Sequence, residues 1–445
     1  MGQRIKFNFK NMRAESFEKN VCGVSDKEIE LNKNDIKRAY ENVIKNPSKE
    51  AKAYFDLVLN PQDLDKIKEY AEYISSNFEN FVVLGIGGSA LGARAIFSAL
   101  THMNHKKNKM FRNNRPNWFI RDSINPDKFL SLLEILDCKK TMFCVVTKSG
   151  GTLETLTQLT LVIEKLKKEL GNSYTKNICA ITANKQGKLN KWATENNIKT
   201  FYFSTDVSGR FSVMSAVGLL PAAVVGADLD KILSGAKDML LSAQNEELLN
   251  NPALYGAVLQ KIFMDKGLNI SYLMPYADNL KVLSEWYCQL WAESLGKQIN
   301  FNGTTKYVGQ TPVRALGTVD QHSQLQLCLE GKFDKVMTFI RVENFFNDAI
   351  IPDLKNGLLD DCFKNKKLSD ILNTSQEATE KAMFECGRVS RTIVVDKVDE
   401  YVMGNLMMFF MLETSFAGEL LGLNTYNQPS VELIKVNIKK MLSEK

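Results

Sequence analysis

Histidine is scarce in this 445-residue sequence, and its cysteines are never closely paired. There are three histidines and eight cysteines, none of which forms a Cys-x-x-Cys pair. Metal sites and disulfide frameworks need several such residues at short or regular spacing. We therefore expect no metal, no cofactor bound through such a cluster and no disulfide framework. Isolated cysteines in apolar runs behave as small hydrophobic residues, which fits a reducing cytoplasm.

The sequence also has no apolar run long enough to cross a membrane. The longest, residues 212–227, contains Pro221 and is shorter than the roughly 20 residues that a spanning helix needs. Residues 1–20 are charged and lack the apolar core of a secretory signal. We expect a cytoplasmic protein with no membrane partner.

No strong excess of one charge points to a nucleic-acid partner. The formal net charge is +6, from 57 Lys and Arg against 51 Asp and Glu. The densest basic stretch, residues 105–112, is not embedded in a recognisable nucleic-acid-binding motif. A solvated loop is favoured there over a nucleic-acid patch, and no nucleic acid is expected.

What the sequence does contain is a series of short apolar runs that alternate with amphipathic helical stretches. Strands are predicted at 81–86, 118–120, 142–146, 178–182 and 201–203, and again at 271–274, 336–342 and 392–395. Strands that are apolar on both faces are typical of a parallel sheet covered by helices on both sides. The pattern predicts an α/β fold with two αβα sandwiches and helical arms at both ends.

This pattern divides the chain into four parts. Residues 1–65 are predicted as an N-terminal helical arm, 66–228 as a first α/β domain, 229–400 as a second and 401–445 as C-terminal helices. A chain of this length has enough residues for two hydrophobic cores.

Two strand–helix junctions carry glycine and hydroxyl residues. The first, around Gly88 and Ser89, matches the dinucleotide fingerprint by letter but lacks the acidic residue expected about 20 positions later. A phosphate held by backbone N–H groups and the Ser89 hydroxyl is the functional interpretation, and a tight packing turn is the alternative.

The second junction has more polar groups than an N-cap needs; they are Thr147, Lys148, Ser149 and Thr152. Two such turns at one sheet edge predict a single phosphate held from two sides.

Two charged residues stand in apolar surroundings. Arg210 precedes a very apolar helical stretch and is either an ion-pair partner or a fixed charge for an oxyanion. Glu293 shares a helical face with Leu283, Trp286 and Leu290 because of their spacing. A carboxylate there is either a structural partner or a general base whose pKa is raised by burial.

Two further titratable residues lie in helical contexts. His322 precedes a short predicted helix, 323–330, and a helix N-terminus lowers the pKa of a nearby imidazole. Lys435 shares an apolar face of the predicted helix 430–442, where burial would lower the pKa of its ammonium group. A structural histidine and a lysine that extends to solvent are the alternatives.

Taken in order, these motifs resemble the glucose-6-phosphate isomerase family, also called the phosphoglucose isomerase family. The resemblance spans residues 80–442 and rests on six segments, GIGGSALG at 85–92, TKSGGT at 147–152, GRFS at 209–212, ESLGK at 293–297, GTVDQHS at 317–323 and YNQPSVELIK at 426–435. Each segment alone is weak, whereas all six in order are specific. The resemblance implies two sugar-isomerase domains with flavodoxin-like parallel sheets, and no metal or cofactor.

The resemblance also implies the reversible isomerisation of glucose 6-phosphate and fructose 6-phosphate. Glu293 would carry a proton between C2 and C1 through a cis-enediolate, with Arg210 beside the negative oxygen. His322, assisted by Lys435, would open the sugar ring from the partner subunit of a homodimer. The implied substrate-binding residues are Gly88, Ser89, Thr147, Lys148, Ser149, Thr152 and Gln428.

Three neighbours of these residues depart from the family's usual sequence: Ser208, Leu295 and the pair Pro429–Ser430. Related enzymes that act on mannose or amino-sugar phosphates and phosphosugar-sensing regulators are the rival interpretations. The combination of Glu293, His322 and Lys435 favours the glucose–fructose reaction. A sensor would need an output module such as a helix-turn-helix, and residues 1–65 do not suggest one.

Overall fold

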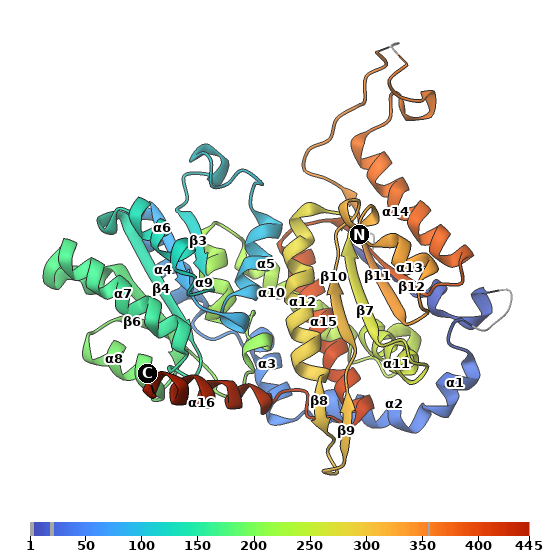
Figure 1. Cartoon of the computed structure of the whole chain (residues 1–445), viewed down its shortest axis with the longest axis horizontal. Helices are drawn as coiled ribbons and strands as arrows, with labels where there is room; N and C mark the ends of the chain where they lie inside the picture. The colour runs from blue at the N-terminus through green and yellow to red at the C-terminus, as the bar shows by residue number, and fades with distance from the viewer. Residues whose placement is uncertain (1–3, 18–21, 355–356, 445) are drawn as a thin grey trace.

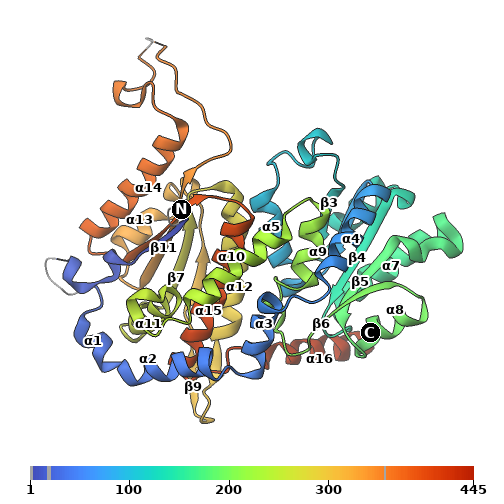
Figure 2. The same cartoon turned by 180° about the vertical axis from the view of Figure 1, so that it is seen from behind.

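A computed structural model describes residues 4–17, 22–354 and 357–444 of the chain. Two halves, each built on a five-stranded sheet, lie side by side (Figures 1 and 2). The helices α5, α10, α12 and α15 run between the two sheets (Figure 1). This arrangement confirms the predicted α/β class with parallel sheets.

The first sheet has the strand order β3-β2-β4-β5-β6, and all its neighbours are parallel. Successive side chains of its strands point into different cores: Val82 and Leu84 meet α6, α7 and α8, whereas Phe81 and Val83 face α4, α5 and α9. Burial on both faces explains why these strands are continuously apolar. The strands are β2 (Asn80–Leu84), β3 (Asn117–Arg121), β4 (Thr141–Thr147), β5 (Ile178–Ala183) and β6 (Lys199–Phe203). The covering helices are α4 (Leu64–Asn77), α5 (Leu91–Leu100), α6 (Pro126–Ile135), α7 (Leu153–Leu170), α8 (Gly187–Glu195) and α9 (Ala216–Val224).

The second sheet has the order β1-β12-β11-β7-β10, in which only β1 is antiparallel to its neighbour. Met337 and Phe339 of β11 pack toward α13 and α14, and Val336 and Ile340 pack toward the helices between the sheets. The strands are β1 (Ile5–Asn8), β7 (Ile270–Pro275), β10 (Thr311–Arg314), β11 (Lys335–Asn344) and β12 (Ser390–Lys397). The helices of this half are α10 (Leu229–Ser242), α11 (Pro252–Asp265), α12 (Lys281–Leu295), α13 (Leu325–Glu330), α14 (Leu368–Glu385) and α15 (Glu400–Leu421).

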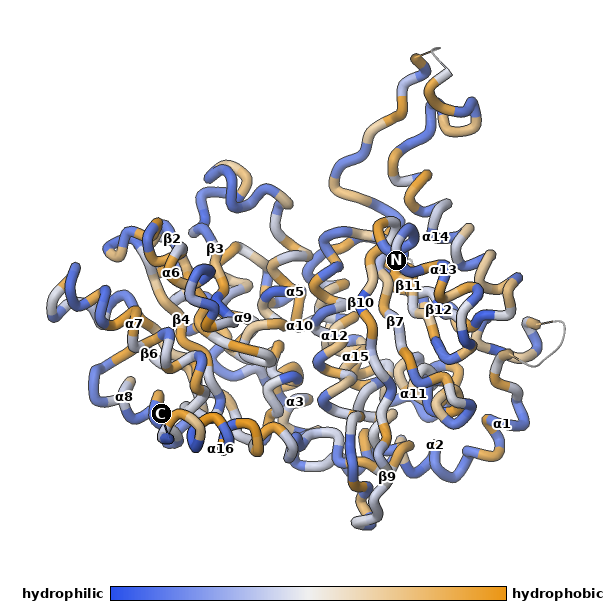
Figure 3. The backbone as a smooth tube through the Cα atoms, in the orientation of Figure 1, coloured by the Kyte–Doolittle hydropathy of each residue, from blue (hydrophilic) through white to orange (hydrophobic). Residues whose placement is uncertain are grey.

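Helix α15 is buried on nearly all sides because it packs against α10, α11 and α12 at once. Its Glu413 is fully buried and forms an ion pair with Arg391 of β12. No helix in the described ranges is long and apolar enough to cross a membrane. The hydropathy of the backbone is shown in Figure 3, where apolar residues concentrate in the strands and the interior helices.

The remaining elements lie at the periphery of the two sandwiches. The N-terminal helices are α1 (Asp26–Leu31), α2 (Lys33–Tyr40) and α3 (Lys49–Leu59), and a small hairpin joins β8 (Lys297–Ile299) to β9 (Thr305–Val308). The last helix, α16 (Ser430–Ser443), runs along the lower edge of the first half (Figure 1). The strands β1, β8, β9 and β10 were not predicted from the sequence, because each has only three or four residues and includes polar or proline positions. The domain boundaries at 65, 228 and 400 stay a prediction.

Candidate active site

Two turns leave neighbouring strands at the carboxyl edge of the first sheet. Strand β2 leads into η4 (Gly87–Ser89), and β4 leads into the turn 148–152. The strands are in parallel register, with Leu84 opposite Val145. A Cβ placed on Gly85 would lie 3.1 Å from the Ser89 Cβ and 3.3 Å from the Val146 Cβ. The two predicted phosphate turns are therefore adjacent.

The hydroxyl groups of the second turn bond to one another. Thr147 Oγ1 lies 2.7 Å from Thr152 Oγ1 and 3.5 Å from Ser149 Oγ. The backbone N–H of Gly151 donates to Ser149 Oγ over 3.3 Å. This cluster opens the 18-residue helix α7, whose N-terminus carries a partial positive charge. Hydroxyls, backbone N–H groups and a helix dipole together favour an anion such as a phosphate.

Lys148 adds a positive charge to this turn. It is half-buried, and burial lowers the pKa of its ammonium group. The negative charge of Asp206 opposes that shift, whereas the positive charge of Arg210 adds to it. Lys148 therefore adds a second positive charge near that of Arg210.

Direct backbone contact connects the glycine turn to the same arginine. A Cβ placed on Gly88 would lie only 2.3 Å from the carbonyl carbon of Gly209 and 2.7 Å from the amide nitrogen of Arg210. Glycine at position 88 is required for this approach, because any side chain would push the two turns apart. Arg210 sits in η8 (Gly209–Phe211), directly against the first phosphate turn.

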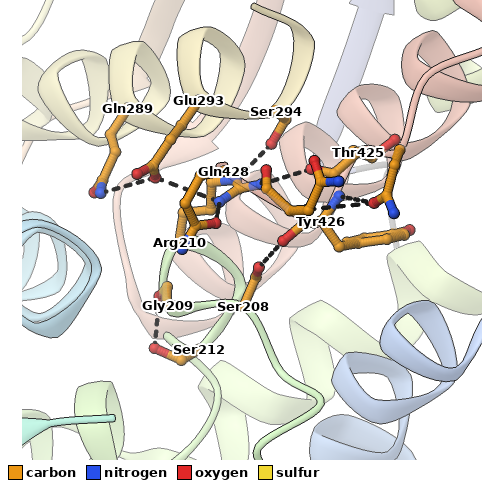
Figure 4. Close-up of polar contacts among 12 residues, drawn as sticks. Ser208, Gly209, Arg210, Ser212, Gln289, Glu293, Ser294, Thr425, Tyr426 and Gln428 are labelled. Atoms are coloured by element: carbon orange, nitrogen blue, oxygen red, sulfur yellow. Dashed lines mark hydrogen bonds and ion pairs between the residues drawn. The ribbon is translucent and has the colours of Figure 1, made fainter. Parts of the chain in front are cut away.

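Arg210 is the most heavily hydrogen-bonded side chain of the site, and it is only 2% exposed (Figure 4). Burial lowers the pKa of its guanidinium group, and the nearby Glu293 carboxylate raises it. An arginine keeps its charge under such a shift. Its acceptors are Ser294 Oγ at 2.7 Å, Glu293 Oε2 at 3.4 Å, Gln428 Oε1 at 2.7 Å, the Thr425 carbonyl at 2.6 Å and the Asn427 carbonyl at 3.2 Å.

Glu293 lies in the last turn of α12 and points toward Arg210 (Figure 4). Leu283, Trp286 and Leu290 on the same face are buried as the spacing predicts, but the Glu293 side chain is 28% exposed. Ser294 and Leu295 at the end of the helix stay buried, whereas the Glu293 side faces the turns of the first sheet, where Gly87 lies against Gln289. Its Oε2 also accepts a 3.2 Å hydrogen bond from Gln289 Nε2, whereas no group of the described chain donates to Oε1.

Two residues near Glu293 were missed as site residues in the sequence. Gln289 is one helical turn before Glu293 and bonds its carboxylate. Lys297 follows the helix and is 9% exposed. Spacing could have identified Gln289, because a residue four positions before Glu293 lies on the same side of the helix.

The structure does not bring His322 to Glu293 within one chain. His322 is exposed, and its neighbour Gln321 accepts a 2.9 Å hydrogen bond from Tyr276, which follows β7 and precedes α12. Glu293 is at the opposite end of that helix. Glu293 is twelve positions after Lys281, which is about 18 Å along the helix at 1.5 Å per residue.

The other C-terminal residues of the predicted site divide between two positions. Gln428 bonds Arg210 and is part of the cluster around Glu293. Lys435 is exposed on α16. No group of three or more His, Cys, Asp or Glu side chains is placed to hold a metal ion in the part of the chain that the structure describes.

Comparison with known proteins adds an independent line of evidence. The family model described as "Phosphoglucose isomerase" matches residues 49–445. A glucose-6-phosphate isomerase of Carboxydothermus hydrogenoformans is 37% identical over 430 residues, which cover 96% of this chain and 92% of that protein. A glucose-6-phosphate isomerase of Methanocaldococcus jannaschii is 36% identical over 403 residues, covering 91% and 92% of the two chains.

Solved structures agree with this result. A hypothetical protein of Thermus thermophilus superposes with a TM-score of 0.87 at 32% identity, covering 98% of this chain and 99% of that one. A glucose-6-phosphate isomerase of Chlamydia trachomatis superposes with a TM-score of 0.76 at 22% identity, covering 92% and 78% of the two chains, and shows the shared fold. With the family model matched over most of its length, the chain belongs to the phosphoglucose isomerase family.

Proposed function

We propose that this protein interconverts glucose 6-phosphate and fructose 6-phosphate, with Glu293 as the base that carries the proton. Family membership supports an isomerase that acts on glucose 6-phosphate. The observation that carries the residue assignment is the contact between the immobilised guanidinium of Arg210 and the partly exposed carboxylate of Glu293. No metal or cofactor takes part in the proposed reaction.

The substrate phosphate is assigned to the two turns of the first sheet. The N-terminus of α7 and the ammonium of Lys148 supply positive charge, and hydroxyl and backbone groups supply hydrogen bonds. Because Gly88 abuts Gly209, a sugar extending from this phosphate runs past Arg210 toward Glu293. The residues assigned to binding are Gly88, Ser89, Thr147, Lys148, Ser149, Thr152 and Gln428.

Proton transfer follows from the arrangement at the end of α12. Glu293 removes the proton from C2 of the open-chain aldose, and the electron pair forms the C1=C2 bond while O1 becomes negative. A proton moves from the O2 hydroxyl to O1, and Glu293 returns its proton to C1, which gives the ketose with no net oxidation. Arg210 is already fixed by five acceptors, so its charge stabilises the cis-enediolate without reorganisation.

Ring opening is assigned to His322 of a second copy of the chain, with Lys435 assisting. Within one chain His322 stands at the far end of α12 and is exposed. In a two-fold symmetric dimer the same surface is used by both subunits, so each could supply a histidine to the other. The proposed working unit is therefore a homodimer with two composite sites.

The test of the base is the variant Glu293→Gln, assayed for fructose 6-phosphate conversion by a coupled measurement of glucose 6-phosphate. The amide has nearly the same shape but cannot accept the C2 proton, so kcat should fall by roughly 10³–10⁴-fold. Glu330→Gln, at an exposed carboxylate on α13, is the matched control and should keep wild-type kcat. A Glu293→Gln enzyme with near-normal turnover would remove Glu293 from the reaction.

A further inference from the structure

Lys297 occupies a buried position between two parts of the site. Its Nζ donates to the Glu293 carbonyl over 2.6 Å and to the Asn427 carbonyl over 2.7 Å. The Glu293 carbonyl belongs to the last turn of α12, where carbonyl groups lack partners within the helix and the dipole favours a positive charge. Lys297 therefore connects the end of α12 to the segment near the C-terminus.

That segment, residues 424–428, is held by three side chains from distant parts of the chain. Ser208 Oγ donates to the Tyr426 carbonyl over 2.5 Å. Arg210 donates to the carbonyls of Thr425 and Asn427 and to the side chain of Gln428. The Asn427 carbonyl accepts from both Arg210 and Lys297, so two cations share one backbone oxygen.

We propose that Lys297 is a positioning residue for this isomerase reaction, whose ammonium group holds segment 424–428 against the end of α12 so that Arg210 stays beside Glu293. The inference rests on the proposed function and extends it to a residue that touches neither the phosphate turns nor the reacting atoms. The bond to the Glu293 carbonyl fixes the end of α12, and the bond to the Asn427 carbonyl fixes the segment that orients Arg210.

The charge of Lys297 matters because its two acceptors are carbonyl oxygens, which bind an ammonium group more strongly than a neutral amine. The charged groups that face it are Arg210 from η8 and Glu293 from α12. Burial and the positive charge of Arg210 lower the pKa of Lys297 to about 8, and Glu293 opposes that shift. The ammonium form is present below this pKa and is lost as the pH rises through it.

The experiment compares Lys297→Met and Lys297→Arg with wild type, using fructose 6-phosphate as substrate between pH 6.5 and 9.5. Loss of two hydrogen bonds from a charged donor should lower kcat by on the order of 30-fold in Lys297→Met. KM should change far less, because the phosphate turns are untouched. Lys335→Met is the control: Lys335 is 7% exposed and bonds the Lys332 carbonyl and Asp334, so kcat should stay close to wild type.

The pH profile separates positioning from a merely structural role. Wild-type kcat should fall above a pH of about 8 as Lys297 loses its proton. In Lys297→Arg the guanidinium stays charged, so part of the activity should return and the alkaline decline should move to higher pH. The proposal is overturned if Lys297→Met loses no more kcat than Lys335→Met, or if a folded Lys297→Arg keeps the wild-type decline.

Amide hydrogen exchange tests the same contact without substrate and without a variant. Protection of residues 424–428 in wild type, corrected for intrinsic exchange, should drop between pH 7 and pH 9, and unchanged protection would also overturn the proposal. If wild type shows no isomerase activity, the proposed function fails, whereas the exchange result still reports on whether Lys297 holds the segment.

Discussion

The two ends of helix α12 differ in how completely one chain surrounds them. At the Glu293 end, side chains from η8, from α12 and from segment 424–428 form a continuous hydrogen-bonded cluster. At the other end, His322 is exposed to solvent beside the loop that precedes the helix. The Glu293 end of α12 is thus enclosed by side chains of its own chain, whereas an exposed histidine lies near the other end.

This difference is the basis of the proposed division of the site between two subunits. In the proposed site the phosphate turns, Arg210 and the base Glu293 come from one chain, whose own contacts hold them together. The ring-opening histidine is assigned to the other chain. Variants on the two sides should therefore behave differently when they are mixed.

The largest expected effect that distinguishes the two ends is that of His322→Ala. Turnover of the ring-closed sugar should fall by roughly 100-fold, because a general acid–base group is lost. An open-chain substrate analogue should be slowed far less, since it needs no ring opening. Equal slowing of both substrates would remove His322 from ring opening.

Mixing His322→Ala with Glu293→Gln subunits sharpens this test. In a mixed two-fold dimer one site receives both substitutions and the other receives neither, so random mixing should restore about a quarter of wild-type activity. The unmixed variants, taken through the same unfolding and refolding, are the controls. Absence of restored activity in mixed dimers would place His322 and Glu293 in the same subunit's site.

A smaller effect is expected for Ser149→Ala, on the side of the site that one chain completes. Loss of one hydrogen bond to a charged phosphate should raise KM by roughly 10-fold with little change in kcat. Thr160→Ala, at an exposed hydroxyl further along α7, is the control and should leave KM unchanged. In a mixture of Ser149→Ala and Glu293→Gln subunits, every site with an intact Glu293 should also carry the Ser149→Ala substitution, so no active site should have the wild-type KM. An active site with the wild-type KM would contradict the proposed division.

The smallest effect concerns Ser208, which stands where the family commonly has glycine. Ser208→Gly and Ser208→Ala both remove the hydrogen bond to the Tyr426 carbonyl, which should cost about 1 kcal/mol. The melting temperature should fall by about 1 °C, while kcat stays within about threefold, because Arg210 and Lys297 still hold the segment. A melting temperature of Ser208→Ala equal to wild type would show that the hydroxyl contributes nothing.

Local patterns in the sequence were sufficient for the five strands of the first sheet, each of which overlaps a predicted apolar run. The central strands β2, β4 and β5 are short runs buried on both faces, which gives a continuous apolar signal in the sequence. Strand β1 could not be found in this way, because its four residues become a strand only by pairing with β12, almost 400 positions later. Long-range pairing of that kind leaves little trace in a short segment.

The site residues show the same limit. The positions of Arg210 and Glu293 could be identified as candidates, and the family resemblance named their partners. Two of the five acceptors that hold Arg210 are the backbone carbonyls of Thr425 and Asn427, and carbonyl direction depends on the path of the chain rather than on residue type. Partial exposure of Glu293 likewise depends on how its side of α12 meets the turns of the first sheet.

The contact between Gly88 and Gly209 has a consequence for attempts to alter the substrate range. The contact is asymmetric: a methyl group on Gly88 would collide with the Gly209 backbone at 2.3 Å, whereas one on Gly209 would meet only the Gly88 Cα at 3.8 Å. In a saturation-mutagenesis library, position 88 should therefore tolerate almost no replacement, and position 209 should accept alanine on steric grounds. Directed evolution toward bulkier sugar phosphates has room on the arginine side of this contact and none on the phosphate side.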